Sequence, residues 1–282
     1  MGKKPGKLAP KWQYIGLGAL ALATAGSVSF ALADSREQPP VSDAIASYAA
    51  SAPAQPTREP ARLPATARPA VAAAVGLLND PAREWNMTLL GDSTGNDINE
   101  FTFILAQQMT VAYNRPVIVH RWTDGLGYSE EKRFGFGGGA PIHIWNGSAP
   151  GKTGGYAVDN LKVIAPAGSD LTIVNYGHNY KATWGLDSGM IQLVQSLDQQ
   201  NGPTPMLFIL QNPQHPETPG SAAIVERLRT LTSEGGYEVV DVYKAFKDAG
   251  DIAPLMLDSI HPNPAGSKVW ADAVAAKLGV TA

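Results

Sequence analysis

The chain has 282 residues, of which 44% are hydrophobic and 17% are charged, and its formal net charge is -3. These values are typical of one globular domain with room for an extra segment, and they exclude a protein that binds nucleic acid through a basic surface. No cysteine is present, which excludes a disulfide framework, a thiolate nucleophile and a cysteine metal site. A domain of this size can be stable without disulfides, so the sequence does not argue against export.

The first 33 residues have the three parts of an export signal. Four lysines within the first eleven residues give a basic start, and an uncharged stretch follows from residue 13 to residue 33. That stretch ends in Ala31-Leu32-Ala33, a small-residue cleavage pattern, before Asp34. Its length also approaches the roughly 20 residues that a helix needs to span a bilayer. We therefore expect residues 1–33 to be either a cleaved signal peptide or a single-pass membrane anchor, with the rest of the chain extracytoplasmic.

Residues 34–83 are rich in alanine and proline, as in Ala52-Pro53-Ala54-Gln55-Pro56. Such a segment buries too little apolar surface to offset the entropy of ordering, which predicts an extended, disordered linker. A short helix over residues 71–78 is the one element expected within it. The globular domain is predicted to cover residues 84–282.

Short apolar runs alternate with helical patterns in this domain. Six runs predict buried strands, over residues 86–90, 117–120, 142–145, 171–175, 206–210 and 237–242. Apolar residues at helical spacing predict helices over residues 98–112, 190–197 and 224–231, and a final helix with Asn263 as cap, Pro264 in its first turn and Gly279 past its end. This alternation predicts an α/β fold with a central parallel sheet and helices on both faces. Because sites in such sheets lie at the carboxyl ends of the strands, the residues after each strand are the candidates.

Four polar segments carry candidate chemistry. Gly91-Asp92-Ser93-Thr94-Gly95-Asn96 follows the first predicted strand, and a serine in such a turn before a helix exposes its hydroxyl as a nucleophile requires. The other three segments are Asn146-Gly147-Ser148-Ala149-Pro150-Gly151-Lys152-Thr153, Asn175-Tyr176-Gly177-His178-Asn179 and Asp258-Ser259-Ile260-His261-Pro262-Asn263. Each is ambiguous alone, since a turn serine often only caps a helix. Their order and their positions after predicted strands make a shared site the better interpretation.

In this order the four segments resemble the signature blocks of the SGNH (GDSL) hydrolases, and the resemblance spans residues 84–282. It implies a flavodoxin-like three-layer α/β/α sandwich and a serine hydrolase that cleaves ester bonds without a cofactor. By the same resemblance Ser93 is the nucleophile, and Asp258 with His261 forms the D-x-x-H pair. The oxyanion hole is implied to consist of the Ser93 N–H, the Gly151 N–H and the Asn179 side chain, with Gly147 as the alternative to Gly151.

The residue types fit this chemistry. His261 would take the proton of Ser93 and return it to the leaving alkoxide, while Asp258 would fix the tautomer of the imidazole. Two departures from the family pattern stand out: Thr94 replaces a leucine, which predicts a more polar pocket wall, and Tyr180 replaces an aspartate. We expect three substrate-binding residues, Thr94, His178 and Trp184.

Two other motifs are set aside. The first segment also satisfies G-x-S-x-G, but a nucleophile elbow lies mid-chain and its acid is usually many residues from the histidine. Gly151-Lys152-Thr153 ends like a phosphate-binding loop, but Asn146 stands where that motif needs a glycine. The histidines lack metal-ligand spacing, so no metal is expected, and His120, His143 and Trp145 are predicted to have structural roles. The glycines at 135–139 predict a flexible loop.

The sequence therefore predicts an extracytoplasmic serine esterase, that is, a carboxylic ester hydrolase that forms an acyl-enzyme. Its expected substrate is an O-acetyl or other short acyl group on a glycan or a small ester. A lipase or thioesterase acting on lipid acyl esters is the first alternative, and a catalytically inactive envelope-binding module with the same fold is the second. We expect a monomer, with no nucleic-acid partner.

Overall fold

The structure is a computed structural model that describes residues 61–280. The predicted export segment and most of the predicted linker lie outside the described residues. Within residues 61–280, no helix is both long enough and apolar enough to cross a bilayer.

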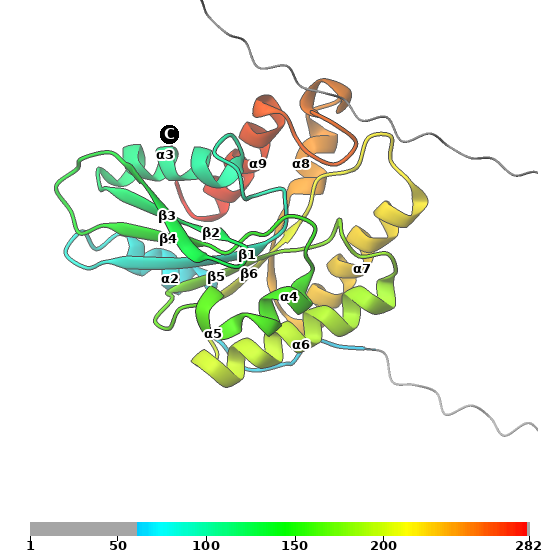
Figure 1. Cartoon of the computed structure of the whole chain (residues 1–282), viewed down its shortest axis with the longest axis horizontal. Helices are drawn as coiled ribbons and strands as arrows, with labels where there is room; N and C mark the ends of the chain where they lie inside the picture. Colours follow the sequence, from blue (N-terminus) through cyan, green and yellow to red (C-terminus); the bar gives the residue numbers. More distant parts are fainter. Residues whose placement is uncertain (1–60, 281–282) are drawn as a thin grey trace, which may run out of the picture. The chain divides into compact units, whose positions relative to one another are not determined.

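A seven-stranded sheet in the order β3-β2-β4-β1-β5-β6-β7 forms the centre of the molecule (Figure 1). All neighbouring strands are parallel except β2 and β3, which form an antiparallel hairpin. The strands are β1 (Trp85–Gly91), β2 (Val117–Thr123), β3 (Gly127–Phe134), β4 (Ile142–Asn146), β5 (Leu171–Asn175), β6 (Met206–Leu210) and β7 (Glu238–Asp241). The mostly parallel α/β sheet predicted from the sequence is confirmed.

The strand order explains where a site can form. Without the β2–β3 hairpin, the sheet reads β4-β1-β5-β6-β7, which is the doubly wound order 2-1-3-4-5. The chain leaves β1 for α3 (Phe101–Tyr113) on one face of the sheet and leaves the neighbouring β5 for α6 (Thr183–Asn201) on the other face, so the loops after β1 and β5 diverge and leave a crevice at the carboxyl end of β1. The hairpin extends the sheet beyond β4. Strand β3 was not predicted, because its sequence is a charged run, Ser-Glu-Glu-Lys-Arg over residues 129–133, that lies on the exposed edge.

Helices cover both faces of the sheet (Figure 1). One apolar core joins the sheet to α2 (Val71–Leu78), α3 (Phe101–Tyr113), α8 (Val242–Asp248) and α9 (Pro264–Lys277). The other core joins it to α4 (Gly154–Asp159), α5 (Leu161–Ile164), α6 (Thr183–Asn201) and α7 (Pro219–Gly235). Strand β1 serves both cores, because Met87 and Leu89 pack into the first and Leu90 into the second. The result is a three-layer α/β/α arrangement.

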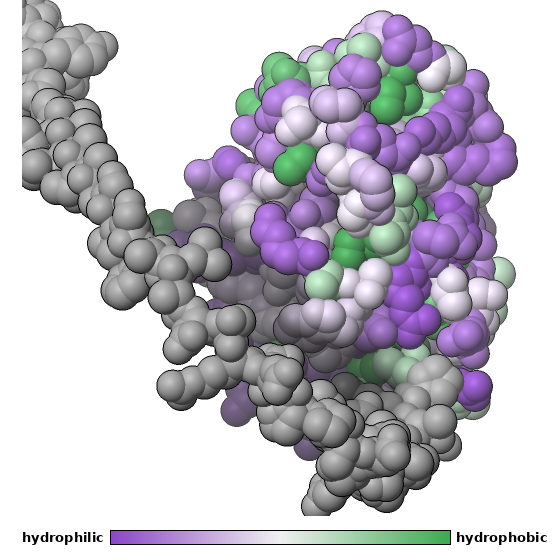
Figure 2. Space-filling model, turned by 90° about the vertical axis from the view of Figure 1, so that its right-hand side faces the viewer, coloured by the Kyte–Doolittle hydropathy of each residue, from purple (hydrophilic) through white to green (hydrophobic). Residues whose placement is uncertain are grey.

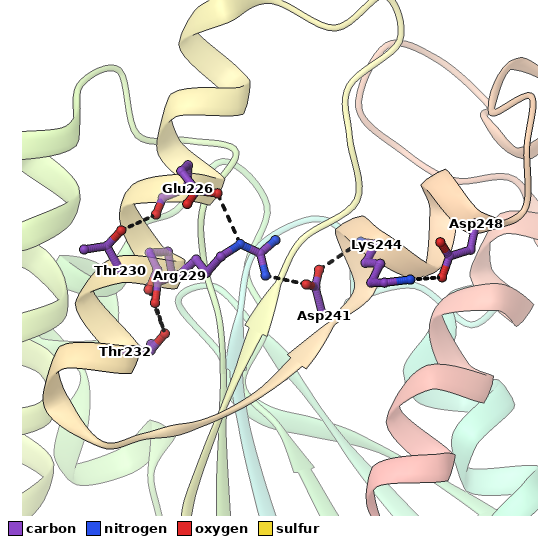
Figure 3. A network of polar contacts seen from close by, with 8 residues as sticks. Glu226, Arg229, Thr230, Thr232, Asp241, Lys244 and Asp248 are labelled. Atoms are coloured by element: carbon purple, nitrogen blue, oxygen red, sulfur yellow. Dashed lines mark hydrogen bonds and ion pairs between the residues drawn. The ribbon is translucent and has the colours of Figure 1, made fainter.

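Ion pairs and caps fix the helix ends near the carboxyl edge of the sheet. Asn263 caps α9 by accepting hydrogen bonds from the backbone N–H groups of Ala265 and Gly266, as predicted. Arg229 on α7 pairs with both Glu226 and Asp241, and Asp241 also accepts a hydrogen bond from the backbone of Lys244 at the start of α8 (Figure 3). These contacts join α7, β7 and α8.

The folded part begins earlier than the sequence predicted. Within the expected linker, Leu63, Val71 and Leu78 are buried in the two cores. Arg68 forms a 2.8 Å ion pair with Asp198, so the segment is also held by charge. The predicted helix over residues 71–78 is present, but it packs on the fold instead of merely leading into it. The prediction of a linker up to residue 83 is therefore wrong for residues 61–83, because its few apolar residues are too widely spaced among alanine and proline to indicate burial.

Candidate active site

Ser93 lies in the turn that follows β1, at the crevice that the strand order predicts. The turn is packed tightly against its neighbours, since a Cβ added at Gly91 would lie 2.8 Å from Ser148 Oγ and 3.2 Å from the carbonyl oxygen of Asn175. Gly91 therefore lets β1 end close to the loops that follow β4 and β5. The Ser93 side chain itself stays partly exposed.

The structure brings Ser93, His261 and Asp258 together into a hydrogen-bonded relay. Ser93 Oγ lies 2.8 Å from His261 Nε2, and His261 Nδ1 lies 2.8 Å from Asp258 Oδ2. Since an ionised carboxylate only accepts hydrogen bonds, Nδ1 carries the proton and Nε2 is free to accept that of Ser93. Ser93 and His261 are 168 residues apart in the chain, and His261 lies just before Asn263, the N-cap of α9.

The loop around Asp258 is organised by its own backbone. Asp258 Oδ1 accepts hydrogen bonds from the N–H groups of Ile260 and His261, at 2.8 and 2.7 Å, while Oδ2 faces the ring. Slight burial raises the pKa of Asp258, but the hydrogen bonds from the backbone of His261 and Ile260 and from the imidazole outweigh it and lower that pKa to about 2. Asp258 is therefore ionised at neutral pH and oriented toward His261 before any substrate binds.

The two backbone N–H groups that the sequence assigns to the oxyanion hole are those of Ser93 and Gly151. Among the described residues, neither has a hydrogen-bond partner. Gly151 has φ +73°, a conformation that favours glycine, and a Cβ there would meet no atom within 4 Å. The glycine at this position is thus required by its backbone conformation.

Asn179 lies on the loop after β5 and is only partly free. Its Nδ2 donates a 3.0 Å hydrogen bond to the carbonyl oxygen of Lys152, which leaves its second N–H available. The loop that carries Gly151 and the loop that carries Asn179 are therefore joined to each other.

Gly147, the alternative oxyanion donor, does not fit that role. Its N–H donates to the carbonyl oxygens of Leu89 and Trp145, at 2.7 and 3.1 Å. A Cβ at this position would also lie 2.7 Å from Ile164. Gly147 is a packing glycine, so this alternative is wrong.

Thr94 was expected to form a polar pocket wall, and this expectation is also wrong. Its side chain is only 1% exposed. The hydroxyl donates to Asp92 Oδ1 at 2.8 Å and accepts a hydrogen bond from Asn175 Nδ2 at 3.2 Å. Because it points into the turn and not into the crevice, Thr94 fastens the nucleophile turn to the end of β5.

Two residues directly after β6 were missed by the sequence analysis. Gln211 is buried, and its Nε2 lies within hydrogen-bond distance of Asp92 and Asn175, while its Oε1 accepts the N–H of His178 at 2.7 Å. Asn212 Oδ1 accepts a 3.0 Å hydrogen bond from His178 Nε2, and Asn212 Nδ2 donates to the carbonyl oxygen of Ile260 at 3.0 Å. Their position at the carboxyl end of a predicted strand was the signal that could have found them.

These two amides connect the parts of the site. Gln211 joins the nucleophile turn to the loop after β5, and Asn212 joins that loop to the segment before His261. His178 is thereby held by its ring and by its backbone, and burial lowers the pKa of its imidazole. The predicted site residue His178 thus connects these loops through hydrogen bonds, and it also lines a neighbouring cavity.

A cavity of about 210 Å³ lies beside these loops. It is bordered by His178, by residues 211–214 after β6 and by the start of α7. Its apolar wall includes Ile224 and Leu228, and the buried hydroxyl of Tyr176, which has no hydrogen-bond partner among the described residues, belongs to its lining. Trp184 is not part of this lining; it is 76% exposed in the first turn of α6, and no described contact connects it to Ser93 or His261.

The other predicted structural residues form a separate cluster on the sheet. The rings of His120 and Trp145 stack with centroids 3.8 Å apart, and His120 Nε2 lies 2.9 Å from His143 Nδ1. Burial lowers the pKa of both histidines. Within residues 61–280, no three potential ligands gather into a metal site.

Among the comparisons with known proteins, only the one with solved structures finds similar proteins. No family model matches the sequence, and no curated protein matches it. Among solved structures, a variant of the acetyl-xylooligosaccharide esterase Axe2 of Geobacillus stearothermophilus is 12% identical and matches with a TM-score of 0.53 over 71% of this chain and 97% of its own. A protein of Parabacteroides merdae described as GDSL-like lipase is 14% identical, with a TM-score of 0.52 over 72% and 99% of the two chains.

A third match is a two-domain esterase active on acetylated mannans, crystallised with mannopentaose. It is 14% identical, with a TM-score of 0.55 over 74% of this chain and 53% of its own. At such low identity these matches concern the fold. The chain has the α/β fold of the SGNH hydrolases, and its candidate site lies where that fold places the carboxyl ends of the strands.

Proposed function

We propose that the protein is a serine esterase that hydrolyses carboxylic esters through an acyl-enzyme. The observation that carries the proposal is the relay of Ser93, His261 and Asp258, with both hydrogen bonds at 2.8 Å and the carboxylate ionised by its backbone contacts. A serine next to an oriented imidazole has the activation that a weak hydroxyl nucleophile needs. A binding module with the same fold would have no need of this arrangement.

The reaction follows from the geometry. Ser93 Oγ attacks the ester carbonyl while His261 Nε2 takes its proton, and the positive imidazolium is stabilised by Asp258. The carbonyl oxygen becomes an oxyanion, for which the N–H groups of Ser93 and Gly151 and the second N–H of Asn179 are the donors. His261 then protonates the leaving alkoxide, which leaves an acyl group on Ser93. Water, deprotonated by His261, attacks this acyl group; the bond between the acyl carbon and Ser93 Oγ then breaks, His261 returns the proton to Oγ, and the carboxylic acid leaves.

For the substrate we propose an O-acetyl or other short acyl group on a glycan outside the cytoplasm. Two structural neighbours are esterases of acetylated carbohydrates: one is an acetyl-xylooligosaccharide esterase, and the other is active on acetylated mannans. The face that carries the start of α7 and the loop before it is largely hydrophilic, with scattered apolar side chains (Figure 2). Such a face suits a carbohydrate better than a lipid surface, which favours extended apolar patches.

The second candidate is an esterase for lipid or longer acyl chains. It is favoured by the cavity of about 210 Å³ beside His178, whose wall includes Ile224 and Leu228. A linear acyl chain can lie against such a wall, whereas an acetyl group does not need it. The two candidates therefore differ in how activity changes with acyl length.

We further propose that residues 1–33 direct export, as a cleaved signal or a single-pass anchor, and that residues 34–60 act as a linker. The support is the pattern of lysines, uncharged residues and Ala31-Leu32-Ala33. We propose a monomer without cofactor, since the relay needs only residues of one chain.

The decisive experiment compares wild type with Ser93→Ala on p-nitrophenyl esters of two to twelve acyl carbons. This range of about ten methylenes separates the candidates, because each methylene that becomes buried adds about 0.8 kcal/mol of binding. We expect hydrolysis by wild type, no turnover by Ser93→Ala at unchanged melting temperature, and labelling of Ser93 alone by a fluorophosphonate. Highest kcat/KM for the acetyl ester supports the glycan acetylesterase, and a rise with chain length supports the lipid alternative. Near-normal turnover in Ser93→Ala contradicts the mechanism, and an inactive, unlabelled wild type supports a binding module.

A further inference from the structure

The β2–β3 hairpin reaches the candidate site although it lies outside the doubly wound part of the sheet. Its turn begins at Asp124, directly after the end of β2. Strands β2 and β4 are parallel neighbours, with Arg121 opposite Asn146. The hairpin turn and the loop after β4 therefore leave the sheet at the same edge. The loop after β4 is the one that carries Gly151.

Asp124 is held by two groups from that loop and the helix after it. The carboxylate forms a 2.9 Å ion pair with Lys152 Nζ and accepts a 2.7 Å hydrogen bond from the hydroxyl of Tyr156. That hydroxyl in turn accepts a 2.9 Å hydrogen bond from Trp122 Nε1 on the hairpin, and Lys152 Nζ lies 4.7 Å from the centre of the Tyr156 ring. The hydrogen bonds from Lys152 and Tyr156 lower the pKa of Asp124, and the same contact raises the pKa of Lys152. Asp124 thus has two partners across the contact, Lys152 and Tyr156, and the Tyr156 hydroxyl has two, Asp124 and Trp122.

Lys152 connects two of the three candidate oxyanion donors, the Gly151 N–H and the Asn179 amide. Its own N–H follows Gly151 in the chain and donates to the carbonyl oxygen of Ala149, which closes a turn. Its carbonyl oxygen accepts the 3.0 Å hydrogen bond from Asn179. Gly151 has no packing of its own, since a Cβ there would meet nothing within 4 Å. The position of its N–H therefore depends on how its neighbours are anchored.

We propose that Asp124 is a positioning residue for the oxyanion-binding loop, acting through Lys152 on the Gly151 N–H and the Asn179 amide. A second contact of the hairpin supports this role, because Arg121 Nε donates a 3.0 Å hydrogen bond to the carbonyl oxygen of Asn96 in the segment after the nucleophile turn. The hairpin thereby contacts the segment after β1, which follows Ser93, and the loop after β4, which carries Gly151. This inference rests on the proposed esterase function.

Exposure of the ion pair separates positioning from stability. The side chains of Lys152 and Asp124 are 35% and 53% exposed, and exposed ion pairs contribute little to the free energy of unfolding. Loss of the pair should therefore change kcat and leave the melting temperature almost unchanged. A displaced donor still contributes, so we expect a decrease in kcat of about tenfold, which is smaller than the roughly 10²–10³ seen when an oxyanion donor is deleted.

The test compares Asp124→Asn, Lys152→Met and the double variant with wild type on p-nitrophenyl acetate, which is uncharged. We expect the same kcat decrease in all three variants, with KM and melting temperature unchanged. Either single substitution already breaks the Asp124–Lys152 ion pair, so the second substitution has no further effect. The matched control is Asp248→Asn, which breaks the exposed Lys244–Asp248 pair on α8 (Figure 3) and should have wild-type kcat. Additive losses, or an equal loss in the control, overturn the proposal.

Amide hydrogen exchange of residues 149–153 provides a readout that does not need activity. We expect faster exchange of the Lys152 N–H in Asp124→Asn and no change in Asp248→Asn. Unchanged exchange overturns the proposal, and so does faster exchange with unchanged kcat. If wild type hydrolyses no ester, the esterase proposal fails while the exchange measurement still decides whether Asp124 holds this loop.

Discussion

Glu100 gives the protein a pH-dependent stability that can be worked out from its surroundings. It lies at the N-cap of α3, seven residues after Ser93, and its Oε2 accepts a 2.7 Å hydrogen bond from the N–H of Asp97. Burial raises the pKa of its carboxyl from 4.5 to about 8, with the charges of Asp97 and Asp92 adding to the effect and the backbone hydrogen bonds from Asp97 and Asn96 opposing it. The folded protein therefore keeps this carboxyl neutral at pH 7.

The sign and size of the effect follow from proton linkage. Between pH 4.5 and about 8 the folded state holds a proton that the unfolded state releases, so the free energy of unfolding falls as the pH rises. The stabilisation that comes from keeping the Glu100 carboxyl protonated is complete below pH 4.5, is lost progressively as the pH rises toward 8 and is absent above pH 8. A difference of about 3.5 pKa units corresponds to a loss on the order of 5 kcal/mol at 1.36 kcal/mol per unit.

Glu100→Gln isolates this contribution, because the amide has nearly the same shape, can still accept the N–H of Asp97 and does not ionise. Urea denaturation of both proteins at pH 5, 7 and 9 measures the free energy of unfolding. We expect little difference between them at pH 5 and a variant that is more stable than wild type by several kcal/mol at pH 9.

A matched control is Glu217→Gln. Although slight burial opposes it, the contacts with Lys247 and Tyr243 lower the pKa of Glu217 below 4.5, so its titration lies outside this pH range. Its effect on stability should therefore be the same at pH 5 and pH 9. Parallel stability curves for wild type and Glu100→Gln would refute the reasoning and show that Glu100 is ionised in the folded protein.

Two further predictions concern the oxyanion donor and the domain boundary. Asn179→Ala should lower kcat by about 10²–10³ with a smaller change in KM, because its amide acts on the charge that develops in the transition state; its bond to Lys152 is lost as well, so unchanged kcat in a folded variant would exclude both effects. Deletion of residues 1–60 should leave the melting temperature unchanged, whereas deletion of residues 1–73 should lower it, because the longer deletion removes the buried side chains of Leu63 and Val71 and the Arg68–Asp198 ion pair. Equal melting temperatures would mean that this segment does not stabilise the fold.

The parallel strands were predictable because they are buried on both faces. Strands β5 and β6 are buried at every position: β6 is a continuous apolar run, and β5 is apolar except for Thr172 and Asn175, so both differ from the helices around them. The start of α9 was predictable for a local reason, since Asn263 and Pro264 act within one helical turn. Strand β3 was not predictable in this way, because its pairing with β2 leaves most of its side chains exposed and charged.

The relay residues were predictable from short motifs, but the contacts that hold them were not. Ser93, Asp258 and His261 each carry a characteristic spacing. Thr94 and Gln211 do not, and each bonds a distant residue: Thr94 bonds Asn175, 81 residues away, and Gln211 bonds Asp92, 119 residues away. A motif predicts which atoms react, whereas a buried hydrogen bond between distant loops depends on the whole fold.

The candidate site thus combines exposed residues that react with buried residues that hold them in position. Asp258 and His261 are substantially exposed, so neither can be held in place by packing alone. Their loop is fixed instead by hydrogen bonds within it and by Asn212, which is fully buried and bonds the carbonyl oxygen of Ile260. Displacement of this loop would break the bond from Asn212 Nδ2 to Ile260 and leave one buried N–H without an acceptor, which is opposed by about 1–3 kcal/mol. The buried amides after β6 therefore let the reacting groups stay open to a substrate while their geometry remains defined.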